Sequence, residues 1–425
     1  MDAIQRLLSS VALPKMVRIR QSFDDTRMTD VAGGVRKALH DCPAYHSIKP
    51  GAKLALTVGS RGIASLDVIV RAIVDALKER GAEPFIVPAM GSHGGATAEG
   101  QLELVNELGI TEESAGCPIR SSMEVVQVGR LTDGFPVYMD KYAYEADGVV
   151  VYNRIKPHNA FRHRHESGIM KMLAIGLGKH HGAESTHSMG FGHMGRLIEE
   201  VGAALLATGK VVLGVGSIEN AYDKVKEIVA CGPNDFAMTD REGLKRASAN
   251  MPRLLFDKMD LLICDAIGKE YSGGGMDGNI IGRYSTPFIS GGPDITRVVA
   301  LSLSPKSHGN ATGMGLADVI PDSMVKDIDL FKVYTNCITS GATPSARIPM
   351  HLATEELAIK AGLKTGYEAD TAQALVMRIP NTLHLGEAFI SEAMLPIAME
   401  TKGVTILGDL KPMSFDAGGK LIDKY

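Results

Sequence analysis

The sequence lacks several features that mark particular classes of protein. It contains no tryptophan, and only 5% of its residues are aromatic. No apolar run approaches the ~18 residues that a membrane-spanning helix requires. The first residues also lack the continuous apolar stretch of a signal peptide. The last two absences exclude a membrane span and a signal peptide, and the scattered cysteines described next favour a cytoplasmic protein.

Neither charge nor cysteine content indicates a specialised protein. Lys and Arg total 45 against 49 Asp and Glu, which leaves a net charge of −4 without a basic block. This balance excludes a generally basic nucleic-acid binder. No CxxC pair occurs, so we expect neither a disulfide framework nor a thiolate zinc site. The five scattered cysteines are Cys42, Cys117, Cys231, Cys264 and Cys337.

What the chain does contain is length, apolar residues and glycine. Its 425 residues predict two to three domains, at ~150 residues each. A hydrophobic content of 45% is typical of a globular chain with a large core. With 47 glycines and few aromatics, the composition favours a loop-rich α/β protein over a β-sandwich.

A strand, a glycine loop and a helix follow one another twice near the start of the chain. The first set predicts a strand at Leu54–Val58 and a helix at Leu66–Arg80, and the second a strand at Phe85–Met90 and a helix at Glu99–Leu108. This repetition indicates a parallel sheet with crossover helices. Ligands of such sheets bind beyond the carboxyl ends of the strands, where both glycine loops fall.

The remaining strand candidates suggest two α/β domains with mostly parallel sheets. We expect an N-terminal domain at residues 1–257 and a C-terminal domain at 258–385, because a new strand begins near Asp257–Asp260 after a charged helix. A return of residues 386–425 to the first domain also fits the pattern. The further predicted strands are Gly148–Tyr152, Val211–Val215, Leu261–Cys264, Val298–Leu303, Leu375–Arg378 and Val404–Leu407.

Histidine is concentrated in one region. Seven of the 13 histidines lie within 36 residues, among several lysines and arginines. A solvated polar loop would explain this, but a metal or anionic-ligand site would also use such residues. The spacing matches neither HExxH nor a zinc pattern, so it names no metal. The seven are His158, His163, His165, His180, His181, His187 and His193.

Two residues in the glycine loops are further candidates. His93 lies between glycines after a predicted strand, where the backbone can approach a ligand closely. Arg61 beside turn amides would suit a carboxylate or phosphate. The structural alternatives are a histidine that satisfies backbone groups and an arginine that caps a turn.

Several motifs together resemble the nickel-pincer nucleotide-dependent lactate racemase family. Their order and near-constant spacing extend the similarity over most of the chain. The motifs are Ser60–Gly62, Gly91–His93, Ile155–His158, Glu166–Leu173, Gly182–His187 and Gly275–Arg283.

The resemblance implies a cofactor and the residues that hold it. Family members carry a pyridinium mononucleotide with two sulfur-bearing arms, which binds Ni(II) and is supplied by cofactor-assembly enzymes. By position, Lys171 would attach the cofactor covalently and His187 would bind nickel. Lys179 and the pair His180/His181 are the rivals, and we expect Arg61 and Lys179 near the cofactor. The family fold places the cofactor in a cleft between two α/β domains.

The resemblance also implies an isomerase that acts on a small 2-hydroxy acid. His93 and His158 match the two acid/base histidines, one for each enantiomer. Hydride would pass from C2 to the cofactor and return to the other face of the resulting keto acid. The protein would orient the substrate and exclude water.

Departures from the lactate enzyme bear on the substrate. Val58 replaces an aspartate, while Ile281 and Ser285 stand where that enzyme has a tyrosine and a lysine. We expect Arg283 and Tyr284 to bind substrate instead, and a sugar acid or dicarboxylic acid to be favoured over lactate. The alternatives are a non-racemising hydride-transfer enzyme with the same cofactor and a non-catalytic carrier of it.

Overall fold

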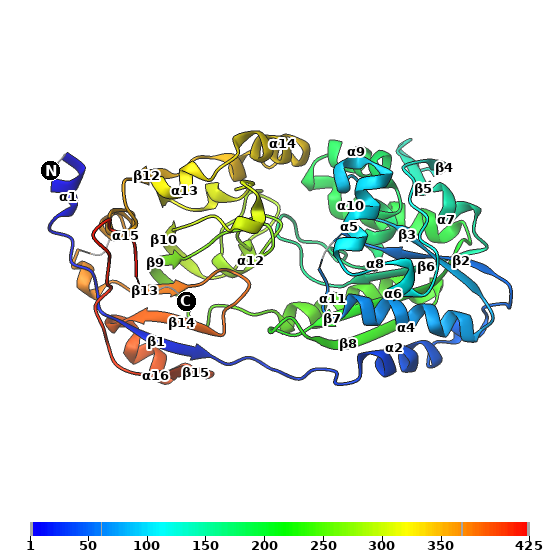
Figure 1. The fold of residues 1–425 in the computed structure, drawn as a ribbon, viewed down its shortest axis with the longest axis horizontal. Coiled ribbons are helices and arrows are strands. Elements are labelled where there is room, and N and C mark those ends of the chain that lie inside the picture. The colour runs from blue at the N-terminus through cyan, green and yellow to red at the C-terminus, as the bar shows by residue number, and fades with distance from the viewer. Residues whose placement is uncertain (1–2, 61, 367–368, 423–425) are drawn as a thin grey trace. The chain divides into compact units, whose positions relative to one another are not determined.

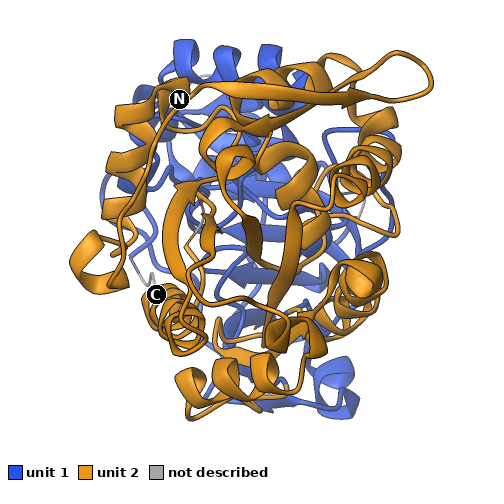
Figure 2. Cartoon of the chain, turned by 90° about the vertical axis from the view of Figure 1, so that its right-hand side faces the viewer, with its two compact units in different colours: residues 1–23, 252–425 blue, residues 24–251 orange. Residues whose placement is uncertain are grey.

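The chain forms two compact units, coloured separately in Figure 2. The computed structural model describes residues 3–60, 62–366 and 369–422. Unit 2 is continuous and comprises Asp24–Met251. Unit 1 combines Met1–Phe23 with Pro252–Tyr425. The chain therefore begins in unit 1, crosses to unit 2 once and returns once.

This division differs from the expected one at both ends of the chain. Strand β1 (Met16–Gln21) pairs antiparallel with β14 (Glu387–Ser391) and β15 (Val404–Ile406). The N-terminal segment thus belongs with residues 252–425, and residues 386–425 do not return to the N-terminal domain. The N-terminal segment joins this sheet by pairing between residues more than 350 positions apart, and such pairing leaves no pattern in the local sequence.

Unit 2 is built around a five-stranded sheet in the order β3-β2-β6-β7-β8 (Figure 1). All neighbours are parallel except β7 and β8. The strands are β2 (Lys53–Val58), β3 (Glu83–Pro88), β6 (Gly148–Arg154), β7 (Val211–Glu219) and β8 (Val225–Cys231). A separate hairpin consists of β4 (Val125–Arg130) and β5 (Pro136–Asp140).

Both faces of this sheet are buried, because side chains alternate along each strand. Leu54 and Leu56 of β2 belong to one apolar core, while Ala55 between them belongs to the other. Helix α4 packs in the first core and α10 in the second. Burial on both faces explains the continuous apolar runs that predicted these strands.

Helices connect and cover the strands of unit 2. Gly81, with φ of 76°, follows the end of α4 in the left-handed conformation that favours glycine. The helices are α2 (Val31–His40), α3 (Pro43–His46), α4 (Leu66–Glu79), α5 (Ala98–Glu107), α6 (Glu112–Ala115), α7 (Lys141–Glu145), α8 (Ile169–Lys171), α9 (Lys179–Ser188), α10 (Phe191–Ala207) and α11 (Phe236–Asn250).

Unit 1 contains an eight-stranded sheet in the order β12-β11-β10-β9-β13-β14-β1-β15. Strands β12 to β13 in this order are parallel, and the last three are antiparallel to their neighbours. The remaining strands are β9 (Lys258–Cys264), β10 (Asp294–Ala300), β11 (Val319–Pro321), β12 (Met350–Leu352) and β13 (Val376–Ile379). The helices are α1 (Ala3–Leu8), α12 (Gly278–Ile281), α13 (Asp322–Lys326), α14 (Leu330–Ser340), α15 (Glu355–Lys364) and α16 (Leu395–Glu400).

The expected fold class, α/β with two mostly parallel sheets, is confirmed. Every strand predicted from an apolar run overlaps an observed strand. The strands that the sequence did not reveal include β1, the hairpin β4–β5 and the antiparallel strands β8 and β14. In the part of the chain that the structure describes, no helix is long and apolar enough to cross a membrane.

Candidate active site

Three of the sequence motifs in unit 2 fall in the loops that follow β2, β3 and β6. From β2 the chain runs outward to β3, and it later returns to form β6 on the other side of β2. The strand order therefore reverses between β2 and β6. Ligands of open α/β sheets bind beyond the carboxyl ends of the strands at such a reversal. The loops after β2, β3 and β6 carry Ser60, His93 and His158.

His93 is held by contacts on both its ring and its backbone. Its Nδ1 hydrogen-bonds the Ser60 hydroxyl, which joins the loops after β3 and β2. The Gln101 amide donates to the carbonyls of Gly91 (2.8 Å) and His93 (3.2 Å). The following residue, Gly94, has φ of 63°, and a Cβ there would lie 2.5 Å from the backbone of Gly100. The glycines thus permit a tight loop that presents an exposed imidazole.

His158 is oriented by its own loop. Its Nδ1 accepts the backbone N–H of Ala160 at 3.1 Å, and its ring lies 4.5 Å from that of Phe161. A neutral imidazole that accepts at Nδ1 carries its proton on Nε2. His158 Nε2 therefore carries the ring proton in this arrangement.

Two buried carboxylates fix the segment between β6 and Lys171. Glu166, 4% exposed, accepts the backbone N–H groups of His158 (2.7 Å) and His163 (3.2 Å). Burial raises the pKa of Glu166, although these N–H donors oppose the shift. Asp240 accepts from His165 Nδ1 at 2.8 Å and from the backbone of Met170 at 3.3 Å.

Lys171 is the last residue of α8 and is partly exposed. A π-helical turn, Met172–Gly176, follows it, and such turns are frequent at functional sites. This turn packs directly on the loop after β3, since a Cβ on Gly176 would lie 2.6 Å from the Ala89 carbonyl oxygen. Lys171 and the His93 loop are therefore held by neighbouring backbone segments.

His187 of α9 has the properties expected of a metal ligand. Burial, assisted by the nearby Lys171 ammonium, lowers its pKa to about 4. The ring is consequently neutral at pH 7, which is the form that binds metals. Its Nδ1 is buried, and among the described residues nothing hydrogen-bonds to it. Phe191 lies 6.1 Å from the ring of His158 and 6.2 Å from that of His187. These features fit a single protein ligand to nickel.

The rival histidines differ in their surroundings. The side chain of His180 is 44% exposed and its Nε2 lies 3.5 Å from Glu184, although its Nδ1 is also buried without a hydrogen bond from any described residue. His181 is exposed beside Tyr138. The proximity of Lys171 thus favours His187. Within the described ranges, no three His, Cys, Asp or Glu side chains form a group that could hold a metal.

Lys179 is fully buried and does not face the site. Its Nζ donates to the Pro88 carbonyl at 2.5 Å and to Oε1 of Gln101 at 2.9 Å, and it lies 3.4 Å from Oδ2 of Asp140. An ammonium group enclosed by three oxygens has a structural role. This geometry does not support the expected contact with a cofactor, nor the alternative attachment at this lysine.

Comparisons with known proteins identify a domain and a similar fold. Residues 16–196 match the model of the lactate racemase N-terminal domain. The chain therefore contains a domain of the lactate racemase family. The lactate racemase apoprotein from Thermoanaerobacterium thermosaccharolyticum has a similar structure, with a TM-score of 0.54 and 13% sequence identity. The match covers 87% of this chain and 98% of that protein. No curated protein sequence matches this chain.

In the lactate racemase family match, Arg61 falls within the N-terminal domain but lies outside the described residues. The residues of unit 1 that were expected to bind substrate make hydrogen bonds within unit 1 instead. Arg283 donates to the carbonyls of Ile295, Thr296 and Leu316 and to Asp318 at 2.7–3.1 Å. These partners lie at the amino ends of β10 and β11, whereas ligands bind at carboxyl ends.

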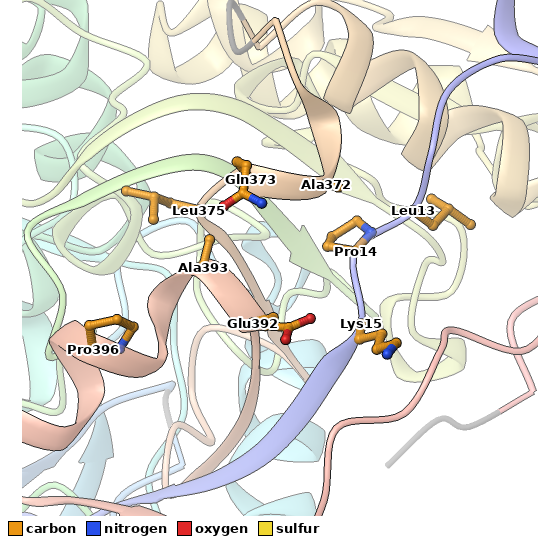
Figure 3. A pocket seen from close by; sticks show the side chains of 9 residues that line it. All are labelled: Leu13, Pro14, Lys15, Ala372, Gln373, Leu375, Glu392, Ala393 and Pro396. Carbon is orange, nitrogen blue, oxygen red and sulfur yellow. The ribbon is translucent and has the colours of Figure 1, made fainter.

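The side chains of Tyr284 and Ile281, on either side of Arg283, are also held within unit 1. The Tyr284 hydroxyl donates to the Gly291 carbonyl at 3.2 Å, and Ile281 is fully buried. A substrate contact by Arg283 or Tyr284 is therefore not supported, because their polar groups already bind the backbone of unit 1. One surface pocket of unit 1 contains none of the predicted site residues (Figure 3). It adjoins Leu375, immediately before β13, and hence the amino end of that strand.

Sequence reasoning missed the residues that position the histidines. Glu166 lies within a recognised motif, eight residues after His158, so the sequence contained a weak indication that it contacts the His158 loop. Gln101 and Asp240 had none, because each reaches its partner only through the folding of distant segments.

Proposed function

We propose that this chain is an isomerase that inverts C2 of a 2-hydroxy acid with a nickel-pincer nucleotide. The observation that carries this proposal is the arrangement of four residues in unit 2. His93 and His158 lie in loops beyond the carboxyl ends of β3 and β6, and Lys171 lies near His187. A carrier would need only the last two residues, so the two oriented histidines favour an enzyme.

His93 and His158 would exchange protons with the substrate hydroxyl. Removal of hydride from C2 requires loss of the hydroxyl proton, and its return requires a donor. The Nε2 proton of His158 makes it a donor in the arrangement that the loop favours. In its hydrogen bond with the Ser60 hydroxyl, His93 Nδ1 accepts or donates according to the tautomer of the ring. The pair can therefore supply one acid and one base.

Lys171 and His187 would hold the cofactor. When bound, the family's nickel-pincer nucleotide supplies the hydride acceptor. The partly exposed Lys171 amine suits an amide-type bond, and the neutral His187 imidazole suits Ni(II) beside sulfur ligands. The substrate is expected to be a sugar acid or dicarboxylic acid, because the phenol and the cation of the lactate enzyme are absent at Ile281 and Ser285.

The attachment is tested by the mass of the protein made with and without the cofactor-assembly enzymes. We expect a mass addition that requires the assembly enzymes and that tryptic mapping places on Lys171, with nickel quantified alongside. Lys171→Ala should abolish it, whereas Lys210→Met should retain it, because Lys210 precedes β7 at the opposite edge of the same sheet. An unmodified, nickel-free wild-type chain under both conditions would contradict the proposal.

The reaction is tested with a panel of 2-hydroxy acids in ordinary and deuterated water, scored by loss of optical purity at C2. We expect turnover of malate, 2-hydroxyglutarate or aldonates to exceed that of lactate. His93→Gln and His158→Gln should each reduce the rate ~100- to 10,000-fold, the usual contribution of acid–base catalysis. A loaded protein that racemises nothing would instead indicate a carrier, and net oxidation would indicate another hydride-transfer enzyme.

A further inference from the structure

The buried lysine of unit 2, Lys179, is an unusual residue for its place in the fold. It has no exposed surface, and its φ of 53° puts a non-glycine residue in the left-handed region. Such a conformation is strained and persists only where surrounding contacts enforce it. Burial lowers the pKa of Lys179 and raises that of Asp140, so the ion pair itself is expensive to bury.

The contacts of Lys179 lead to the loop that carries His93. Its ammonium binds the Pro88 carbonyl at the end of β3 and Oε1 of Gln101. The Gln101 oxygen is thereby fixed as the acceptor, which directs the amide nitrogen to the carbonyls of Gly91 and His93. Two hydrogen-bonded steps therefore join the Lys179 ammonium to the backbone of His93.

The same lysine also connects this loop to the segment after the attachment site. Lys179 begins α9, immediately after the turn that follows Lys171. Asp140, its ionic partner, donates its backbone N–H to the carbonyl of Leu177 at 2.7 Å. Oδ1 of Asp140 accepts the N–H of Ala143 and so caps α7. One buried charge thus holds three segments in a single arrangement.

We propose that Lys179 is a positioning residue that, through Gln101, sets the place of His93 relative to the loop carrying Lys171. This inference rests on the proposed function only in taking His93 as a catalytic residue. The link requires a donor at Lys179 and both an acceptor and a donor at residue 101. An apolar residue at either position would fill the space but would leave the loop carbonyls without their donor.

Gln101→Glu separates positioning from stability. A carboxylate keeps the acceptor for Lys179 and adds a favourable charge, but it cannot donate to the carbonyls of Gly91 and His93. We expect a melting temperature near that of the wild type, normal mass addition at Lys171 and faster hydrogen–deuterium exchange at residues 88–97. In the loaded enzyme, kcat should fall about 100-fold with little change in KM, as expected for a misplaced catalytic group. Gln127→Glu, on the exposed surface of β4, is the matched control.

A second variant examines the lysine itself. Lys179→Met alone would leave the Asp140 carboxylate buried without its cation and could unfold the unit, so Lys179→Met is combined with Asp140→Asn. The double variant should fold and show the same local increase in exchange at residues 88–97. The rate at which diethyl pyrocarbonate modifies His93, followed against pH, should also change, since the Ser60 contact depends on the loop position.

The inference is overturned if Gln101→Glu and the double variant keep wild-type exchange in residues 88–97 and wild-type pH dependence of His93 modification. It is also overturned if every effect follows the melting temperature, as a purely structural role predicts. These measurements use the full chain without cofactor. An unmodified Lys171 would therefore remove the proposed function while leaving this result to be judged separately.

Discussion

At the scale of single residues, the candidate site depends on buried acids as much as on histidines. Glu166 and Asp240 were not predicted as site residues, yet they accept the backbone N–H groups of His158 and Met170. A buried carboxylate is costly unless its oxygens are hydrogen-bonded. Here the donors belong to the segments that must be ordered, so the same bonds satisfy the charge and fix the loop.

Glu166→Ala should lower the free energy of unfolding by about 1–3 kcal/mol, because buried N–H groups lose their acceptor. Glu166→Gln retains an oxygen and should cost less. Since burial raises the pKa of Glu166, the folded state holds this proton more tightly than the unfolded state. The wild type should thus lose stability relative to Glu166→Gln as pH rises above about 4.5. Denaturant unfolding of both proteins between pH 4 and 7 checks this, and a constant difference would contradict it.

At the scale of elements, the site is formed by close packing of two backbone segments. The π-helical turn Met172–Gly176 approaches the loop after β3 at Gly176, where a side chain would contact Met172 and the Ala89 carbonyl. The φ of this glycine is not in the left-handed region, so space rather than backbone conformation requires glycine here. Interiors are too densely packed to absorb such an addition without movement.

Gly176→Ala should therefore separate the turn from the His93 loop. Overpacking of this kind typically costs about 1–3 kcal/mol, and we expect a lower melting temperature together with reduced attachment at Lys171. Gly129→Ala is the control, since its new Cβ would meet nothing within 4 Å. Calorimetry and intact mass measure the two effects. Equal behaviour of the two variants would show that the close approach is unimportant.

At the scale of the whole molecule, the two units differ in the number of chain segments that form them. Unit 2 comes from one continuous segment, whereas β1 from the start of the chain lies between β14 and β15 in unit 1. Without β1, those two strands would lose the partner that joins them, and β14 would become an unpaired edge. The N-terminal segment is thus an integral part of the unit formed mainly by the C-terminal half.

A fragment of residues 24–251 should accordingly fold alone, while residues 252–425 should not. Circular dichroism and cooperative thermal unfolding of the two fragments test this. Adding residues 1–23 in trans as a peptide should restore a cooperative transition to the second fragment. Cooperative folding of residues 252–425 without the peptide would show that β1 is dispensable.

The sequence by itself determined the local features of this protein. Buried parallel strands such as β2, β6 and β9 are continuous apolar runs bounded by turns, so their positions could be predicted from the hydrophobic pattern along the sequence. The motifs around His93, His158, Lys171 and His187 also identified the family, because side-chain chemistry and spacing are properties of the chain. These predictions needed no knowledge of distant contacts.

The tertiary structure decided what depends on distance through space. Only folding brings β1 to β14, Asp240 to His165, and Lys179 to Pro88 and Gln101. The same holds for two predicted site residues: Arg283 and Lys179 are cations in candidate motifs, but the structure places backbone carbonyls and buried oxygens around them. The sequence shows which residues are charged, whereas the packing of segments far apart in the chain determines which groups neutralise them.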